Sequence, residues 1–271
     1  AKWNPVKFLT VNGGLSYKWN RTEYYKILDD LLGGDYYVNI DQFAERDFAA
    51  YPTMIQNDLD YYLKNGAAQT LAQGDKYGYD YYAHVRRAEA WASGRFMFGG
   101  FEATVAGRLG YSKFWREGLL RKGLFPGLDD NGNPFTYNGE IITKYDQIDG
   151  RPITSKGESD KKDFLTGSGK INLGYFISGG HRIYADAAYI TEAPTFNQAF
   201  ISPRTRNTVM PDLKTIKTLT ADINYAYSNS GYDVRVTGFY TSIKDQTDVM
   251  SFYDDSQNSF TNFAMSGIDE R

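Results

Sequence analysis

The sequence predicts an all-β fold, an antiparallel up-and-down transmembrane β-barrel with long extracellular loops, and three observations predict it. Apolar and polar residues alternate over long segments. The connections between these segments alternate between long and short, and 16% of the 271 residues are aromatic. Because successive side chains of a strand point to opposite faces, strict alternation predicts strands with one apolar and one polar face.

The clearest alternation lies between residues 183 and 245. Residues 219–227 carry apolar or aromatic side chains at odd positions, and residues 232–240 carry them at even positions. Polar side chains occupy most positions between them, and the short segment 228–231 separates the two runs. Two long strands joined by a tight turn form a hairpin, so this stretch predicts a pair of adjacent antiparallel strands.

Further strands follow from the same pattern, and about eight are expected in all. One begins near Val6 and alternates to Trp19, and a weaker one covers 79–95 through Tyr81, Ala83 and Val85, with Arg86, Arg87 and Glu89 suggesting a bulge. The others are expected at 101–115, 165–177 and 183–189, with a last strand that opens near Phe260.

The connections alternate in length. Long loops are expected at 22–78, 116–162 and 191–214, with an intermediate one at 246–259 and a short helix at 58–73. The short connections are 96–100, 179–181 and 229–231. In an up-and-down sheet all long loops then lie at one end, and outer-membrane barrels have this asymmetry of long external loops and short periplasmic turns.

The 23 Tyr and 17 Phe need an explanation, because aromatic residues gather at membrane interfaces and on surfaces that stack against ligands. On the apolar face, aromatic residues lie near both ends of the strands. This predicts two aromatic bands (girdles), one at each lipid–water interface. The expected girdle residues are Phe101, Tyr175, Tyr227 and Tyr232 near the short turns, and Tyr17, Trp19, Tyr111, Trp115, Tyr189 and Tyr240 at the other ends. A soluble sandwich whose aromatic residues fill the core is the alternative.

Composition excludes several classes of site. The absence of cysteine excludes disulfides and thiolate metal sites, and two histidines make a His-based metal centre unexpected. A net charge of −3 argues against a nucleic-acid partner. No cofactor, no metal and no catalytic constellation is predicted, and residues 129–133 are interpreted as a polar turn rather than a calcium loop.

Two sets of candidate site residues follow. Charged residues on the polar face of the strands are expected to line a wet lumen: Arg108, Lys170, Asp186, Asp222 and Arg235. Tyrosines in the first long loop are candidate ligand-binding residues: Tyr36, Tyr37, Tyr61, Tyr62, Tyr77 and Tyr79. The alternatives are a solvated sheet face for the first set and packing between loops for the second. His84 could meet a ligand in the lumen, but a hydrogen-bonded structural histidine is the favoured interpretation.

A resemblance adds to this pattern. The chain contains Ala-Pro-Thr-Phe-Asn-Gln-Ala-Phe at 193–200, Met-Pro-Asp-Leu-Lys at 210–214 and a strand that ends Tyr-Thr-Ser-Ile-Lys-Asp at 240–245. This ordered set resembles the barrel of TonB-dependent outer-membrane receptors, most of all those of the Bacteroidetes type. Met210 and Thr215-Ile216 depart from the family pattern, which has Asn and Pro-Glu there.

The resemblance implies that residues 1–271 are a single segment of a 22-stranded barrel, without its plug domain and C-terminal strands. It implies an outer membrane of a Gram-negative bacterium and import of a large scarce solute, such as a siderophore, a cobalamin, a glycan or a peptide. The implied partners are that solute, outer-membrane lipid, the inner-membrane TonB complex acting through the plug, and a surface lipoprotein cap. No chemistry on the solute is expected. A surface or soluble β-structured module that binds glycan or protein, and a small barrel enzyme, stay open as alternatives.

Overall fold

A computed structural model describes residues 1–137, 140–141, 152–255 and 259–271. Eight long strands dominate it, and each follows a segment of alternating sequence. These strands are β2 (Leu9–Ile27), β5 (Lys76–Phe98), β6 (Phe101–Gly118), β10 (Lys162–Phe176), β11 (His181–Glu192), β12 (Ile216–Ser228), β13 (Asp233–Asp254) and β14 (Ser259–Glu270). The short elements are β1 (Lys2–Val6), β3 (Tyr37–Val38), β4 (Thr70–Leu71), β7 (Thr136–Tyr137), β8 (Glu140–Ile141), β9 (Gly157–Glu158), α1 (Gln42–Phe48), α2 (Leu59–Asn65) and α3 (Phe196–Ala199).

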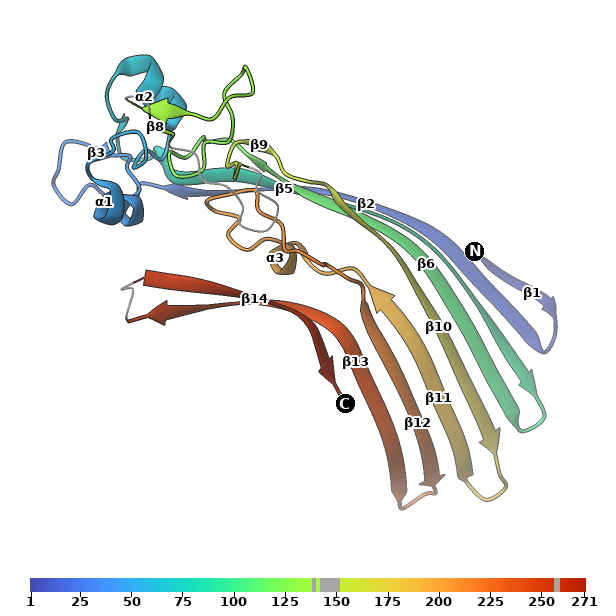
Figure 1. The fold of residues 1–271 in the computed structure, drawn as a ribbon. Helices are drawn as coiled ribbons and strands as arrows, with labels where there is room; N and C mark the ends of the chain where they lie inside the picture. The colour runs from blue at the N-terminus through green and yellow to red at the C-terminus, as the bar shows by residue number, and fades with distance from the viewer. Residues whose placement is uncertain (138–139, 142–151, 256–258) are drawn as a thin grey trace.

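The long strands form one antiparallel meander in the order β1-β2-β5-β6-β10-β11-β12-β13-β14, and the expected all-β antiparallel fold is confirmed. The long loops with α1 and α2 lie at one end of the sheet, and the short turns lie at the other end (Figure 1). We call these the loop end and the turn end. None of the helices in the described part of the chain has the length and apolar character needed to cross a membrane.

Several predicted boundaries were wrong, because the strands are longer than the alternation suggested. Strand β2 continues to Ile27 and β13 to Asp254, so most of the predicted loop 246–259 is strand. The predicted helix 58–73 ends at Asn65, where Gly66 in the left-handed region (φ 70°) caps it. The first strand is broken by a turn after Val6.

The predicted bulge at residues 86–89 was also wrong. The pairing of β5 with both neighbours is continuous there, and the register of β2 against β5 shifts instead between Tyr25 and Lys26. Gly78, opposite this shift, has a φ of 74° that other residues rarely adopt. The irregularity is therefore at the loop end of the strand pair.

The register places the predicted apolar positions on one continuous face of the sheet. This apolar face consists of the odd residues of β2, β6, β10, β11 and β12 and the even residues of β5 and of β13 as far as Tyr240. In the described part of the chain no second sheet covers it, and Leu109 and Ile223 are 68% and 61% exposed. The core of a soluble sandwich would bury such residues.

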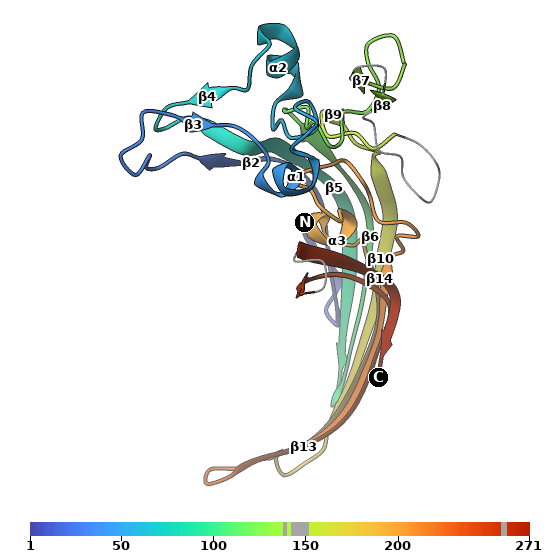
Figure 2. The same ribbon diagram turned by 60° about the vertical axis from the view of Figure 1, so that its left-hand side comes forward.

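The opposite face, which we call the polar face, is concave, and α3 lies against it near the loop end (Figure 2). A small hydrophobic cluster fills the space beneath α3, where Phe114 of β6 packs with Ala199 and Phe200. Tyr81 and Val85 also belong to this face, so they continue the polar face and not the apolar one. The best-packed apolar cluster thus fixes the loop 193–215 to the inside of the curved sheet.

Candidate functional site

The three long loops are joined to one another at the loop end. The Leu59 backbone N–H donates to the Arg121 carbonyl (2.7 Å), and the Gly123 N–H donates to the Gln56 carbonyl (2.8 Å). The Asn207 N–H donates to the Thr154 carbonyl (2.7 Å). The described residues of the loops 28–75, 119–161 and 193–215 therefore form one hydrogen-bonded assembly at the mouth of the curved sheet.

Arg116, near the end of β6, is a buried centre of this assembly and is only 2% exposed. Its guanidinium donates to the Ser155 carbonyl (2.7 Å), to the Pro203 carbonyl (2.5 Å) and to the Asn207 side chain. These acceptors are neutral, and no carboxylate of the described residues forms an ion pair with Arg116. One side chain thus links the sheet with two loops that are far apart in sequence.

Lys122 is a second buried cation, and it fixes the first long loop. Its Nζ donates to Asn57, and Asp41 Oδ2 lies 3.7 Å away. Asn57 in turn donates to Asn39 (3.1 Å), so the cation begins a chain of side-chain hydrogen bonds. Burial lowers the pKa of Lys122 to about 8, although Asp41 acts in the opposite direction. At neutral pH the group is positively charged.

Asp60 fixes α2 to the second loop. Its carboxylate accepts from Arg121 Nε (2.8 Å) and pairs with Lys156 Nζ (2.5 Å). Burial alone would raise the pKa of Asp60, but the two cations outweigh burial and lower it. Helix α2, which carries Tyr61 and Tyr62, is therefore held in place by ion pairs.

The predicted ligand-binding tyrosines are only partly brought together. Tyr37 contacts Tyr77 edge to face, with ring centroids 5.4 Å apart, and Tyr79 lies 6.0 Å from Tyr81. In the described structure, no ring contact joins Tyr36, Tyr61 or Tyr62 to this group. Tyr36 is exposed, as is Tyr61 of α2.

Tyr24, which the Tyr-rich sequence also suggests as a candidate, belongs to this aromatic group, and its partners Tyr81 and Phe196 were missed. Tyr24 of β2 stacks on Tyr81 of β5 with ring centroids 5.2 Å apart, and Tyr81 stacks on Phe196 of α3. Two cations lie over the ring of Tyr79. Lys26 Nζ is 5.7 Å and Arg204 Cζ is 5.4 Å from its centroid. The alternation of Tyr at 77, 79 and 81 was visible in the sequence and could have extended the predicted strand 79–95 to Tyr77.

The five charged residues expected in a lumen all lie on the polar face of the sheet. Arg108 pairs with Glu89 (3.3 Å) and Lys170 lies 3.9 Å from Asp186. Arg235 lies over the Tyr184 ring at 6.0 Å. Asp222 is the direct cross-strand neighbour of Asp186.

A further ion network on the polar face was not predicted. Glu102 pairs with Arg95 (2.8 Å) and Arg182 (3.5 Å) toward the turn end. Together with the five predicted residues, these pairs give the polar face a row of charged groups along its length.

His84 lies on the opposite face from these charges, which agrees with the favoured interpretation of a hydrogen-bonded structural histidine. Its ring stacks on Trp115 at 4.6 Å and hydrogen-bonds Glu117 at 2.7 Å. Trp115 is only 6% exposed, so it packs within the protein and is not the surface girdle residue that the sequence suggested. Both residues have a structural role.

Residues 129–133 form a polar turn, as interpreted from the sequence. The Asp129 carboxylate accepts from the backbone N–H groups of Asn131 (2.9 Å) and Asn133 (2.8 Å), which makes a polar turn. No group of three metal-ligating side chains occurs within the residues that the structure describes.

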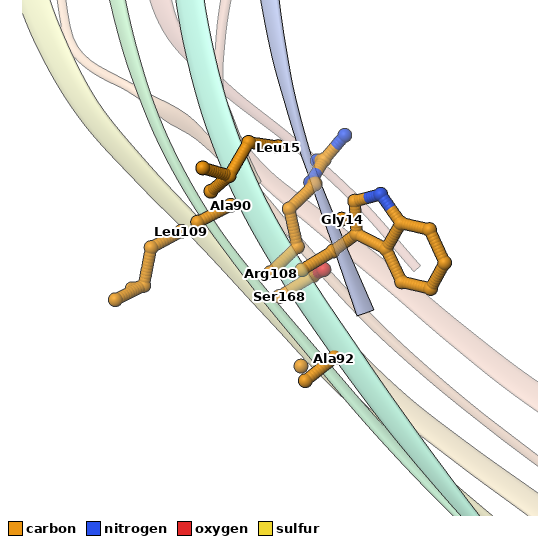
Figure 3. Close-up of a pocket in the computed structure, with 9 residues that line it drawn as sticks. Gly14, Leu15, Ala90, Ala92, Arg108, Leu109 and Ser168 are labelled. Atoms are coloured by element: carbon orange, nitrogen blue, oxygen red, sulfur yellow. The ribbon is translucent and has the colours of Figure 1, made fainter. Parts of the chain in front are cut away.

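A shallow hollow of about 560 Å³ lies halfway along the sheet. Small residues create it, among them Ala90, Ala92 and Gly107, while Leu15 and Leu109 extend from one side of the sheet and Arg108 from the other (Figure 3). The hollow is open and distant from the loop assembly, so the loop end remains the better candidate site.

No family model and no curated protein matches the chain. Among solved structures, the chain aligns over 98% of its length with 40% of the copper transporter OprC, with a TM-score of 0.42 and 10% sequence identity. The chain thus spans less than half the length of that protein. A similarity of this degree identifies neither a family nor a solute, so the function is argued from the chain's own residues.

Proposed function

We propose that this chain is part of an outer-membrane β-barrel receptor that captures a scarce solute at its loop end and admits it along the polar face. The observation that carries the proposal is the uncovered apolar face. On this face no residue is charged between Ala88 and Phe98 of β5, or between Phe101 and Tyr111 of β6. The same holds for the neighbouring strands of the meander.

The dimensions of the apolar face fit a bilayer. Residues 101–111 of β6 form the uncharged part, and a tilted transmembrane strand needs about 9–11 residues. Charged side chains begin directly beyond it toward the loop end, at Arg86 of β5 and Lys113 of β6. Phe101 and Tyr175 limit it at the turn end, where aromatic rings suit a lipid interface.

The curvature of the sheet agrees with this assignment. The charged face is concave and the apolar face is convex, as required for a barrel with a wet lumen and a lipid-facing exterior (Figure 2). Ion pairs such as Arg95–Glu102 and Arg108–Glu89 would then line the lumen. A plug domain seated there would meet this row of charges.

Import driven by an inner-membrane TonB complex rests on the resemblance of residues 193–245 to TonB-dependent receptors. The first part of that segment has a structural role in the loop assembly: Thr195 caps α3 with a capping box, and Phe200 and Met210 are buried. A surface lipoprotein cap over the loops belongs to the same proposal. The solute class implied by the resemblance is a siderophore, a cobalamin, a glycan or a peptide.

Membrane insertion is tested by fractionating cells that express the protein and by purifying it with and without detergent. The proposal expects recovery in the outer-membrane fraction and a monodisperse species only in detergent. A monodisperse product in plain buffer would exclude membrane insertion and would favour a soluble binding module.

Import is tested separately by uptake of labelled ferric siderophores, cobalamin, oligosaccharides and peptides. We expect one class to accumulate, and only in cells with an intact inner-membrane energising complex. Uptake that persists without that complex would remove the TonB-dependent part of the proposal.

A further inference from the structure

We propose that the polar face at the loop end binds an anionic solute that carries a flat ring. The inference rests on the proposed function and narrows its solute class. The surface consists of Tyr24, Lys26, Tyr77, Tyr79 and Arg204, and we call it the cationic tyrosine surface. It lies beside α3, because Tyr24 stacks on Tyr81 and Tyr81 stacks on Phe196 of α3, the helix on the concave side of the sheet (Figure 2).

The first argument is that its two outer cations have no acidic partner among the residues that the structure describes. Lys26 Nζ lies 5.3 Å from the Tyr77 ring centroid, and Arg204 Cζ lies 5.4 Å from that of Tyr79. Both side chains are exposed, and within the described ranges no carboxylate lies within 4.0 Å of either. Elsewhere on the polar face Arg95 and Arg108 each have a glutamate partner.

The second argument is the charge that lies behind this surface. Arg116 contacts the Tyr81 ring at 4.9 Å, and its hydrogen-bond acceptors are all neutral. Lys122 is also buried, with Asp41 as its acidic partner. Among the described residues, four cations therefore lie at or behind this surface: Lys26, Arg204, Arg116 and Lys122. One carboxylate, that of Asp41, is paired with them. Because low-dielectric surroundings screen charge weakly, the buried cations add to the positive potential of the surface.

The third argument is that aromatic rings are held in place beside these cations. Tyr81 is 5% exposed and lies between Tyr24 and Phe196, with interplanar angles of 14° and 11°. Tyr24 itself is 42% exposed and is supported from behind by Tyr81. A flat ring can stack on such a support without a large loss of conformational entropy on the protein side.

These features distinguish an anion with a ring from other solutes. A neutral glycan would use the tyrosines but gain nothing from Lys26 and Arg204. A nucleic acid is disfavoured because the whole chain has a net charge of −3.

The test is isothermal titration of the detergent-purified protein with benzene-1,3,5-tricarboxylate and with the neutral triamide of the same shape. We expect the tricarboxylate to bind, with affinity that falls as salt is raised, and the triamide to bind at least about tenfold more weakly. The double variant Lys26→Gln, Arg204→Gln should weaken tricarboxylate binding by about tenfold or more. Lys64→Gln, which removes an exposed cation of α2, should change it less than about twofold.

Tyr24→Leu tests the ring contact and should weaken the tricarboxylate more than it weakens citrate, an anion without a ring. The inference is overturned by equal affinity for the triamide, by an unchanged double variant, or by no binding at about 10 mM. Circular dichroism of each variant verifies its fold. Membrane fractionation is a separate readout: a protein that inserts but does not bind the tricarboxylate overturns this inference alone.

Discussion

The guanidinium of Arg116 donates a hydrogen bond of 2.7 Å to the carbonyl of Ser155, and it joins the end of β6 to a loop 39 residues further along the chain. The backbone N–H of the same arginine donates to Ser159 Oγ (2.9 Å). The side chain also reaches Asn207 and Pro203 of the third loop. One buried side chain therefore joins the sheet to two of the three long loops.

Arg116→Ala should destabilise the loop assembly by about 2–4 kcal/mol, because it leaves several buried acceptors without a donor. Hydrogen exchange at residues 154–159 and 203–207 measures this effect, and faster exchange is expected there. The matched control is Arg95→Ala, which removes a half-exposed ion pair and should cost less than about 1 kcal/mol. Unchanged exchange in Arg116→Ala would contradict this role.

Gly118→Ala tests the close approach of the same two segments. A Cβ at this position would overlap the carbonyl oxygen of Ser155, so β6 and the loop would have to separate. We expect a loss of about 1–3 kcal/mol, measured by urea unfolding in detergent. Gly169→Ala is the control because nothing lies within 4 Å of its Cβ position. Equal stability of the two variants would contradict the packing described.

Lys122 gives the loop assembly a defined dependence on pH. Its folded pKa of about 8 lies below the ordinary lysine value of 10.5, so above pH 8 the unfolded state binds more protons than the folded state. Stability should therefore rise by about 2 kcal/mol from pH 8 to pH 9.5. Hydrogen exchange of residues 39–60 measures it.

In Lys122→Met most of this rise should be lost, because the variant lacks the buried ammonium group whose pKa is lowered to about 8. Stability that falls over the same pH interval in the unmodified protein would contradict the assignment. The interval ends below pH 10, where the raised pKa of Tyr37, caused by burial, begins to act in the opposite direction.

The apolar face makes a prediction about charge. Leu109→Arg introduces a cation at an exposed position on this face and should lower stability in lipid vesicles by about 2–4 kcal/mol. Ser93→Arg, on the polar face of the adjacent strand, should cost less than about 1 kcal/mol. Urea unfolding in vesicles measures both. Similar costs for the two variants would indicate that the two faces meet the same environment.

Most of the sheet could be predicted from the sequence, because a half-buried strand shows a period of two. The 219–240 hairpin and the last strand near Phe260 follow from this pattern and are present. The strand ends could not be predicted from it. Beyond Trp19 and before Tyr81 both faces carry polar or aromatic residues, since the loops cover parts of both, and the alternation disappears.

The candidate site was predicted only in part for a related reason. The tyrosines of the first loop were visible, but their partners Arg204 and Phe196 come from a loop more than 100 residues away. Only the tertiary fold brings these segments together. For His84 the favoured interpretation from the sequence, a structural histidine, agrees with the fold. Its ring stacks on Trp115 and hydrogen-bonds Glu117.

The most direct test of the account is the environment of the apolar face in a membrane. The chain has no cysteine, so single cysteines can carry spin labels at Leu109, Ile171 and Ile223, and at Thr104, Lys170 and Asp222 on the polar face. In lipid vesicles we expect the first three labels to collide with dissolved oxygen and the second three with a water-soluble nickel complex. Contact between the apolar face and lipid would be contradicted if the nickel complex reached the labels on both faces. It would also be contradicted if neither oxygen nor the nickel complex reached the labels at Leu109, Ile171 and Ile223.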